Sequence, residues 1–223
     1  MEVQVLDNGF VRLDEHAGGD LSVVNGARVS FKRRKEQMDS SDEELIKFLM
    51  EGRHGTPFEH NMFRFHVKAP IFVAREWFRH RIGSFNEWSL RYAKIENPDF
   101  YVPSEFRTQE GKPGEYTFTE YKGDTKSVQA ALIRHNQDGV DLYNWMINRG
   151  IAREQARIVL PLGMFTEFYW TVNARSLMNF LSLRNSQHAQ REIREYAMVI
   201  EEMFADSMPV TARAFVGNGR VAP

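Results

Sequence analysis

The stretch that decides the fold and the chemistry of this chain is Arg79-His80-Arg81-Ile82-Gly83-Ser84-Phe85-Asn86-Glu87-Trp88-Ser89-Leu90-Arg91-Tyr92. Helix capping explains part of it, because Gly83 would end a helix and Ser84 with Glu87 would form the capping box of the next one. Capping leaves the arginines and the neighbouring aromatic residues unexplained. We therefore expect a structural and a chemical role in the same segment.

The arginines of this stretch predict a bound anion. Three consecutive helical residues span about 200° of the helix surface, so Arg79, His80 and Arg81 could not all face solvent. An arginine that points inward needs a negative partner. A phosphate or a carboxylate of a ligand would supply it.

The composition is that of a globular protein. The chain has 223 residues, 42% hydrophobic and 26% charged, with a formal net charge of −1 and no cysteine. The lack of cysteine excludes a thiol nucleophile, a disulfide framework and cysteine-bound metals. The near-neutral charge argues against nucleic acid and membrane partners. The chain also shows neither a signal peptide nor the roughly 18 apolar residues of a membrane span, so a cytoplasmic protein is expected.

Hydrophobic periodicity predicts a mixed α/β (α+β) fold in a single domain, residues 1–223, with a small sheet that contains antiparallel strands and is flanked by long helices. Strands are expected over residues 3–15 (two strands with a turn at Asn8-Gly9), 62–68, 100–102 and 164–172. Helices are expected over residues 41–51, 70–83, 126–148, 151–160, 174–183 and 190–208. Residues 32–35 are expected to form a mobile loop that orders over a ligand, 108–124 a loop or hairpin, and 216–223 a frayed tail.

Two further segments place polar groups where a ligand could use them. Residues 56–59, Thr-Pro-Phe-Glu, have the N-cap, proline and glutamate of a helix start, which is also an anion site. A second set follows one predicted helical face and its end: Asn173, Arg175, Asn179, Leu183 and His188. By itself this set is equally compatible with a capped, solvated face.

Together these motifs resemble those of the flavin-dependent thymidylate synthases. Residues 79–92 fit the pattern RHRxxSxNExSxRY at every fixed position. Residues 54–60 resemble the family's HxTPFEH, residues 153–161 its REQARxxLP, and residues 173–190 its NxRSLxxFxxLR…HAQ. The resemblance runs from residue 3 to about 208 and is weakest over the two predicted loops, 32–41 and 108–124.

The resemblance implies conversion of dUMP to dTMP with FAD as cofactor, 5,10-methylenetetrahydrofolate as one-carbon donor and NADPH as reductant. It implies a homotetramer with shared active sites and no metal. The implied dUMP contacts are Glu76, Arg79, Glu87, Ser89, Arg91, Arg157 and Arg184, of which Arg184 is catalytic. The implied FAD contacts are Thr56, Glu59, Arg79, His80, Arg81, Asn173, Arg175, Asn179, Leu183 and His188, with His54 near the flavin ring and the folate.

The lack of cysteine agrees with this chemistry, since a flavin can replace the thiolate that other thymidylate synthases add to uracil. Ser89 has no base arranged to activate it, so we interpret it as a positioning hydroxyl. Two alternatives stay open. A metal-dependent nucleotide hydrolase would need a ligand cluster that His54 and His60 do not make. A nucleic-acid-binding module built on residues 79–91 would suit a more basic chain.

Overall fold

The computed structural model describes residues 2–93, 95 and 97–223. Its contacts divide the chain into two compact units. The first unit comprises residues 1–88 and 166–223, and the second comprises residues 89–165. The mixed α+β class predicted from the sequence is confirmed. A single domain stays a prediction, so each unit is described by itself.

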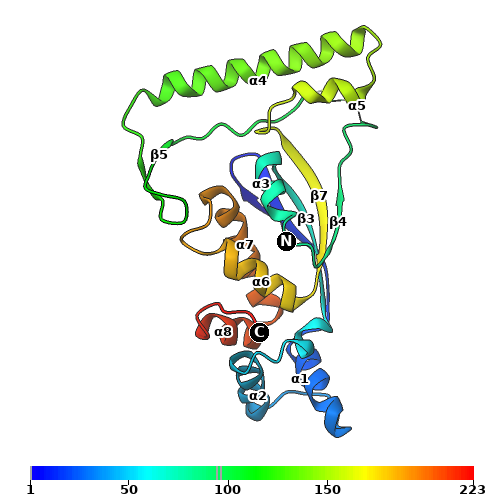
Figure 1. Ribbon diagram of the computed structural model, residues 1–223. Helices are drawn as coiled ribbons and strands as arrows, with labels where there is room; N and C mark the ends of the chain where they lie inside the picture. Colours follow the sequence, from blue (N-terminus) through cyan, green and yellow to red (C-terminus); the bar gives the residue numbers. More distant parts are fainter. Residues whose placement is uncertain (1, 94, 96) are drawn as a thin grey trace. The chain divides into compact units, whose positions relative to one another are not determined.

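A five-stranded sheet forms the frame of the first unit, in the order β1-β2-β3-β7-β4 (Figure 1). The pairs β1–β2, β2–β3 and β4–β7 are antiparallel. The predicted first hairpin is confirmed, but its turn comprises residues 6–8 rather than Asn8-Gly9, because Gly9 already pairs with Val5 in the sheet. Leu6 and Asp7 in this turn have positive φ values, 52° and 59°. The strands are β1 Glu2–Val5, β2 Gly9–Ala17, β3 Met62–Pro70, β4 Ser84–Glu87 and β7 Phe165–Val172.

Helices pack on one face of this sheet because the strands alternate. In β3, Phe63, Phe65 and Val67 are fully buried, whereas the residues between them are partly exposed on the other face. The helices that contact the strands or one another around this core are α3 Ile71–Trp77, α6 Ala174–Arg184 and α7 Arg191–Ser207. The unit is completed by α1 Asp20–Arg28, η1 Val29–Phe31, α2 Ser40–Glu51, η2 Thr56–Glu59 and α8 Pro209–Gly217.

Trp77 lies at the centre of an aromatic cluster that joins these layers. Its ring centroid is 5.3 Å from that of Phe168, 5.5 Å from Trp170, 4.9 Å from Phe180 and 5.8 Å from Tyr196. Aromatic pairs at these separations attract one another beyond the burial of their surface. Because Trp77 ends α3, the cluster fixes the point from which residues 79–82 leave the helix.

The helix predicted over residues 70–83 is confirmed only over residues 71–77, and the prediction of a second helix capped by Ser84 was wrong. Helix α3 ends at Trp77, and Ser84–Glu87 is an edge strand paired with β7. Pairing with β7 satisfies backbone groups that a capping box would have served. The ring of Phe85 also packs 6.1 Å from that of Trp170, and the Glu87 carboxylate accepts a hydrogen bond of 2.8 Å from Thr166 Oγ1.

Other parts of the first unit extend or correct the expectations. Helices α1 and α8 were not predicted from the sequence. Residues 216–223 are docked, not frayed: α8 continues to Gly217, and Pro223 is buried. In the loop over residues 32–35, Lys35 Nζ lies 2.5 Å from an Asp39 oxygen and 2.7 Å from an Asp42 oxygen. That end of the expected mobile loop is therefore anchored.

The second unit is built around one long helix. Its elements are the hairpin of β5 Arg107–Glu110 and β6 Thr117–Glu120, followed by α4 Thr125–Asn148, α5 Arg153–Ala156 and η3 Arg157–Val159. The hairpin and α4 were predicted, whereas the helix over residues 151–160 is shorter than expected. The strand over residues 100–102 is reduced to one bridge between Phe100 and Met164. In neither unit does a described helix have the length and apolar character needed to cross a membrane.

Candidate functional site

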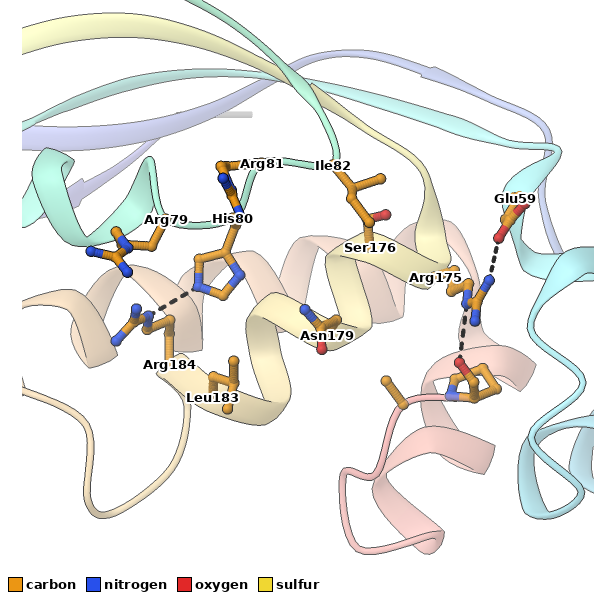
Figure 2. Close-up of a pocket in the computed structure, with 12 residues that line it drawn as sticks. Glu59, Arg79, His80, Arg81, Ile82, Arg175, Ser176, Asn179, Leu183 and Arg184 are labelled. Atoms are coloured by element: carbon orange, nitrogen blue, oxygen red, sulfur yellow. Dashed lines mark hydrogen bonds and ion pairs between the residues drawn. The ribbon is translucent and has the colours of Figure 1, made fainter. Parts of the chain in front are cut away.

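A cavity of about 550 Å³ lies in the first unit, next to the segment that follows α3 (Figure 2). Its volume is within the range of small-molecule sites. Four stretches far apart in the sequence form its walls: the end of η2, residues 79–82, one face of α6, and residues 222 and 223. The lining residues are Glu59, Arg79, His80, Arg81, Ile82, Arg175, Ser176, Asn179, Leu183, Arg184, Ala222 and Pro223. Most of the implied FAD contacts therefore lie together.

Helix α6 supplies the longest wall. Arg175, Asn179 and Leu183 follow one another at four-residue spacing, which places them on one helical face. Asn173 begins the helix, and its Oδ1 accepts a 2.9 Å hydrogen bond from the Ser176 backbone N–H. Asn173, an implied cofactor contact, thus acts as the N-cap, while Ser176, which the sequence did not single out, lines the cavity.

Arg184, at the other end of α6, is held by two groups from the α3 region. Its Nε donates to His80 Nε2 over 3.0 Å, and its Nη1 lies 3.4 Å from the Glu76 carboxylate. Burial, together with the positive charge of Arg184, lowers the pKa of His80 to about 4. At neutral pH His80 is therefore an uncharged acceptor that orients the guanidinium of Arg184.

The neutral His80 predicts a pH-dependent stability. In the unfolded chain this histidine takes up a proton near pH 6.5, whereas in the folded protein it stays neutral to about pH 4. The unfolded state therefore binds more protons between these values, so this contribution to stability is complete above pH 6.5 and falls as the pH is lowered to 4. Urea unfolding at pH 7 and pH 5 should show a smaller loss of stability in His80→Gln than in the unsubstituted protein. Equal losses in both proteins would contradict the assignment.

Arg175 is fixed at the opposite end of the cavity. Its Nη1 is paired with the Glu59 carboxylate at 2.5 Å (Figure 2). Its Nε donates to the Pro223 carbonyl oxygen over 3.2 Å. Its guanidinium also lies against the backbone of Gly55, where a Cβ atom would clash with Arg175 Nε. Any side chain at position 55 would therefore displace this arginine.

The charges of the cavity suit an anionic ligand. Four guanidinium groups line it, from Arg79, Arg81, Arg175 and Arg184, against the single carboxylate of Glu59. Within the described ranges, the side chains of Arg79 and Arg81 form no hydrogen bond or ion pair with the protein. Guanidinium groups bind phosphates through paired N–H donors. The donor set therefore fits the diphosphate of a dinucleotide cofactor such as FAD.

Some implied contacts of the first unit lie outside this cavity. His54 is exposed and stacks on Phe48, with 5.5 Å between the ring centroids. The expected helix start at Thr56 is a four-residue 3₁₀ turn whose N-cap is Gly55, without a side-chain cap, so no helix N-terminus forms an anion site there. His188 is exposed in the loop after α6, where its backbone N–H donates to Ser186 Oγ over 3.2 Å.

The remaining implied dUMP contacts, Ser89, Arg91 and Arg157, belong to the second unit. The Arg91 guanidinium lies 4.9 Å from the centroid of the Tyr92 ring and donates to its hydroxyl over 2.9 Å. Ser89 Oγ accepts a weak 3.4 Å contact from the Arg91 backbone. Arg157 is exposed, and its Nε donates to the Glu154 carbonyl over 3.3 Å.

Glu87, the last implied contact, lines a second hollow of about 400 Å³ in the first unit. His66 stands in its wall, with Nε2 3.1 Å from a Glu167 oxygen and Nδ1 2.8 Å from Arg12 Nη2. The Tyr169 ring stacks on the His66 ring at 4.7 Å. The sequence analysis missed these residues. The alternation in β3 and β7 shows which side chains point outward, but not which side chains of neighbouring strands contact one another on that face. No cluster of three or more potential metal ligands occurs among the described residues.

Comparison with known proteins decides between the interpretations. A family profile described as "Thymidylate synthase complementing protein" matches residues 12–210. The flavin-dependent thymidylate synthase of Thermosipho melanesiensis is 49% identical over 219 residues, which cover 97% of this chain and 94% of that protein. The chain belongs to the flavin-dependent thymidylate synthase family. The enzyme of Thermus thermophilus is 43% identical, over 96% of this chain and 78% of its own.

A solved structure extends the likeness to three dimensions. The UMP/dUMP methylase PolB from Streptomyces cacaoi, bound with 5-Br dUMP, superposes with a TM-score of 0.90 and is 41% identical. The match covers 99% of this chain and 100% of that one. Membership of the flavin-dependent thymidylate synthases confirms the enzyme class inferred from residues 79–92, and with it a flavin as the cofactor. The hydrolase and nucleic-acid-binding alternatives are thereby set aside.

Proposed function

We propose that this protein converts dUMP to dTMP, with FAD as cofactor, 5,10-methylenetetrahydrofolate as one-carbon donor and NADPH as reductant, in the cytoplasm. One observation carries the proposal: four arginines, Arg79, Arg81, Arg175 and Arg184, line a single cavity. Among the described residues, the side chains of Arg79 and Arg81 have no protein partner. The donors of the cavity match a nucleotide phosphate, and family membership supplies the flavin chemistry.

The residues divide the work between binding and catalysis. Arg79, Arg81 and Arg175 would hold phosphates of the cofactor, with Asn179 and Ser176 as neutral donors beside them. Arg184, aimed by His80 and Glu76, would stabilise the negative charge that develops on uracil as carbon 5 attacks the one-carbon unit. A bound flavin would supply the reducing equivalents that the protein side chains lack.

The sugar of the nucleotide defines a second candidate substrate. PolB is a UMP/dUMP methylase, and a second structure of it, bound with 5-Br UMP, superposes on this chain with a TM-score of 0.88. Because this chain is 41–42% identical to that protein, methylation of UMP is a specific alternative to methylation of dUMP. The two substrates differ only at the 2′-hydroxyl, so product analysis separates them.

The assembly is proposed to be a homotetramer with shared sites. Helix α4 exposes Leu142 by 45% and Trp145 by 50%, and their three-residue spacing places them on one helical face that a second subunit could cover. In such an assembly, Ser89, Arg91 and Arg157 of one subunit could complete the dUMP site of a neighbouring subunit. A monomer in sedimentation that still binds FAD fully would contradict this assembly.

One experiment tests the proposed function. The purified protein should be yellow and should release FAD on denaturation, and with dUMP, methylenetetrahydrofolate and NADPH it should form dTMP. UMP in place of dUMP tests the second candidate, and omission of the folate is the control. A colourless protein that binds neither FAD nor FMN, or a yellow protein that methylates neither nucleotide, would refute the proposal.

A further inference from the structure

Residues 218–223, which follow α8, return to the cavity of the candidate site, where Ala222 and Pro223 form part of its wall. We propose that this segment, called the strap, positions the Arg175 guanidinium and thereby sets the affinity for the flavin nucleotide. The inference rests on the proposed function, because it takes the cavity to be the FAD site. The family motifs of the sequence analysis end before the strap begins.

The strap is anchored outside the cavity by Arg220. Its Nη2 lies 2.7 Å and its Nε 3.0 Å from the two carboxylate oxygens of Glu201, and Ser182 Oγ donates to its backbone carbonyl over 2.6 Å. The Glu201 side chain is only 14% exposed whereas that of Arg220 is 42% exposed, so the carboxylate of this two-point ion pair is shielded from water and the guanidinium is partly solvated. Hydrogen bonding to Glu201 raises the pKa of Arg220, which is therefore always charged.

The backbone also shows that the strap is held in place. Arg220 has a φ of 57°, in the left-handed region that non-glycine residues rarely adopt. Such a conformation persists only where the surroundings determine it. Here the Arg220 backbone N–H donates to the Phe215 carbonyl over 3.0 Å, and the Glu201 ion pair and the Ser182 hydrogen bond hold the same residue from other sides.

At its far end the strap touches Arg175 directly. The Pro223 carbonyl accepts the Nε–H of Arg175, while Glu59 accepts from Nη1. The backbone of Gly55 supports the guanidinium from a further side. Two of the five N–H donors of Arg175 are thus used for orientation, which leaves three to bind phosphate oxygens. Neither Gly55 nor Pro223 was singled out by sequence reasoning.

A preoriented arginine binds an anion more tightly than a mobile one, because less rotamer freedom is lost on binding. Releasing the strap should therefore weaken FAD binding, although no side chain proposed to contact FAD is removed. We expect about a 3- to 10-fold faster dissociation of FAD when Arg220 is replaced by alanine.

The test compares three variants of the full-length holoenzyme. Arg220→Ala removes the anchor, Arg220→Lys keeps its charge, and Arg213→Ala removes another arginine that pairs with a glutamate, Glu43, at 3.4 Å but lies outside the cavity. FAD release after dilution is followed by the recovery of flavin fluorescence. Faster release in Arg220→Ala, partial rescue in Arg220→Lys and no change in Arg213→Ala are expected.

A second readout does not depend on the cofactor. In the NMR spectrum of flavin-free protein, the Nε–H resonance of Arg175 should shift in Arg220→Ala and not in Arg213→Ala. If Arg220→Ala fails to fold, Ser182→Ala takes its place. It removes the contacts of the Ser182 hydroxyl with the Arg220 carbonyl at 2.6 Å and with the Met178 carbonyl of its own helix at 2.9 Å, and leaves every charged group in place. Unchanged FAD release together with an unchanged Arg175 resonance would overturn the strap. An unsubstituted protein that binds no FAD would overturn the proposed function and with it the flavin role of the strap, whereas a shifted resonance would still establish the contact with Arg175.

Discussion

Replacement of Arg184 by alanine is expected to lower dTMP formation by roughly 10²–10³, the usual loss when a preoriented electrostatic donor is removed. Arg184 is aimed by His80 at 3.0 Å and Glu76 at 3.4 Å, so its charge is in place before the reaction begins. NADPH oxidation does not require negative charge on uracil. It should survive in the variant, uncoupled from dTMP formation.

The measurement is dTMP formed beside NADPH oxidised, under single-turnover and steady-state conditions. Arg184→Lys is the matched variant, because it keeps the charge but loses the planar fork that contacts both His80 and Glu76. We expect it to recover only part of the activity. A parallel loss of NADPH oxidation and dTMP formation, with FAD still bound, would show that Arg184 does not act at the uracil step.

Ser89→Ala distinguishes this mechanism from a serine nucleophile. Ser89 Oγ has only the 3.4 Å contact with the Arg91 backbone, and no base lies beside it among the described residues. Loss of one neutral hydrogen bond costs about 0.5–1.5 kcal/mol, so the variant should still form dTMP, more slowly or with weaker dUMP binding. Complete loss of dTMP with intact dUMP binding would assign the nucleophile to Ser89 instead.

Trp77→Ala is expected to destabilise the protein by about 3–5 kcal/mol, as large-to-small substitutions of buried aromatic residues do. Trp77 is fully buried and contacts four other aromatic rings, so the cavity left behind cannot easily collapse. Urea unfolding measures the effect. FAD binding should weaken as well, because Trp77 ends the helix from which residues 79–82 depart.

Two variants serve as controls for this result. Trp88→Ala changes a tryptophan that is 40% exposed and should cost much less stability. Trp77→Phe keeps most of the ring contacts and removes an indole N–H that has no partner among the described residues, so its cost should be well below that of alanine. A similar loss of stability in all three variants would show that the contacts of Trp77 in the aromatic cluster do not cause it.

The accuracy of prediction from the sequence differs between secondary-structure elements. The alternation in β3 and the long apolar period of α4 predicted both correctly, since each signal is local. Ser84–Glu87 has equally strong local capping signals but is a strand, because its backbone pairs with β7, about 80 residues away in the chain. Pairing over that distance leaves no mark in the segment itself.

The same division holds for the site. Residues 79–92, with the motifs around residues 54–60 and 173–190, were sufficient by themselves to determine the family. They also singled out Glu59, Arg79, Arg175 and Arg184 as ligand contacts, and the structure places these four side chains in one cavity. Only the tertiary structure decided that His80 stays neutral, that Asn173 caps α6, and that Pro223 holds Arg175. These properties depend on burial and on partners contributed by distant segments. The sequence determines which side chains are present. The protonation state and orientation of those side chains are set only when folding brings their partners within hydrogen-bond distance.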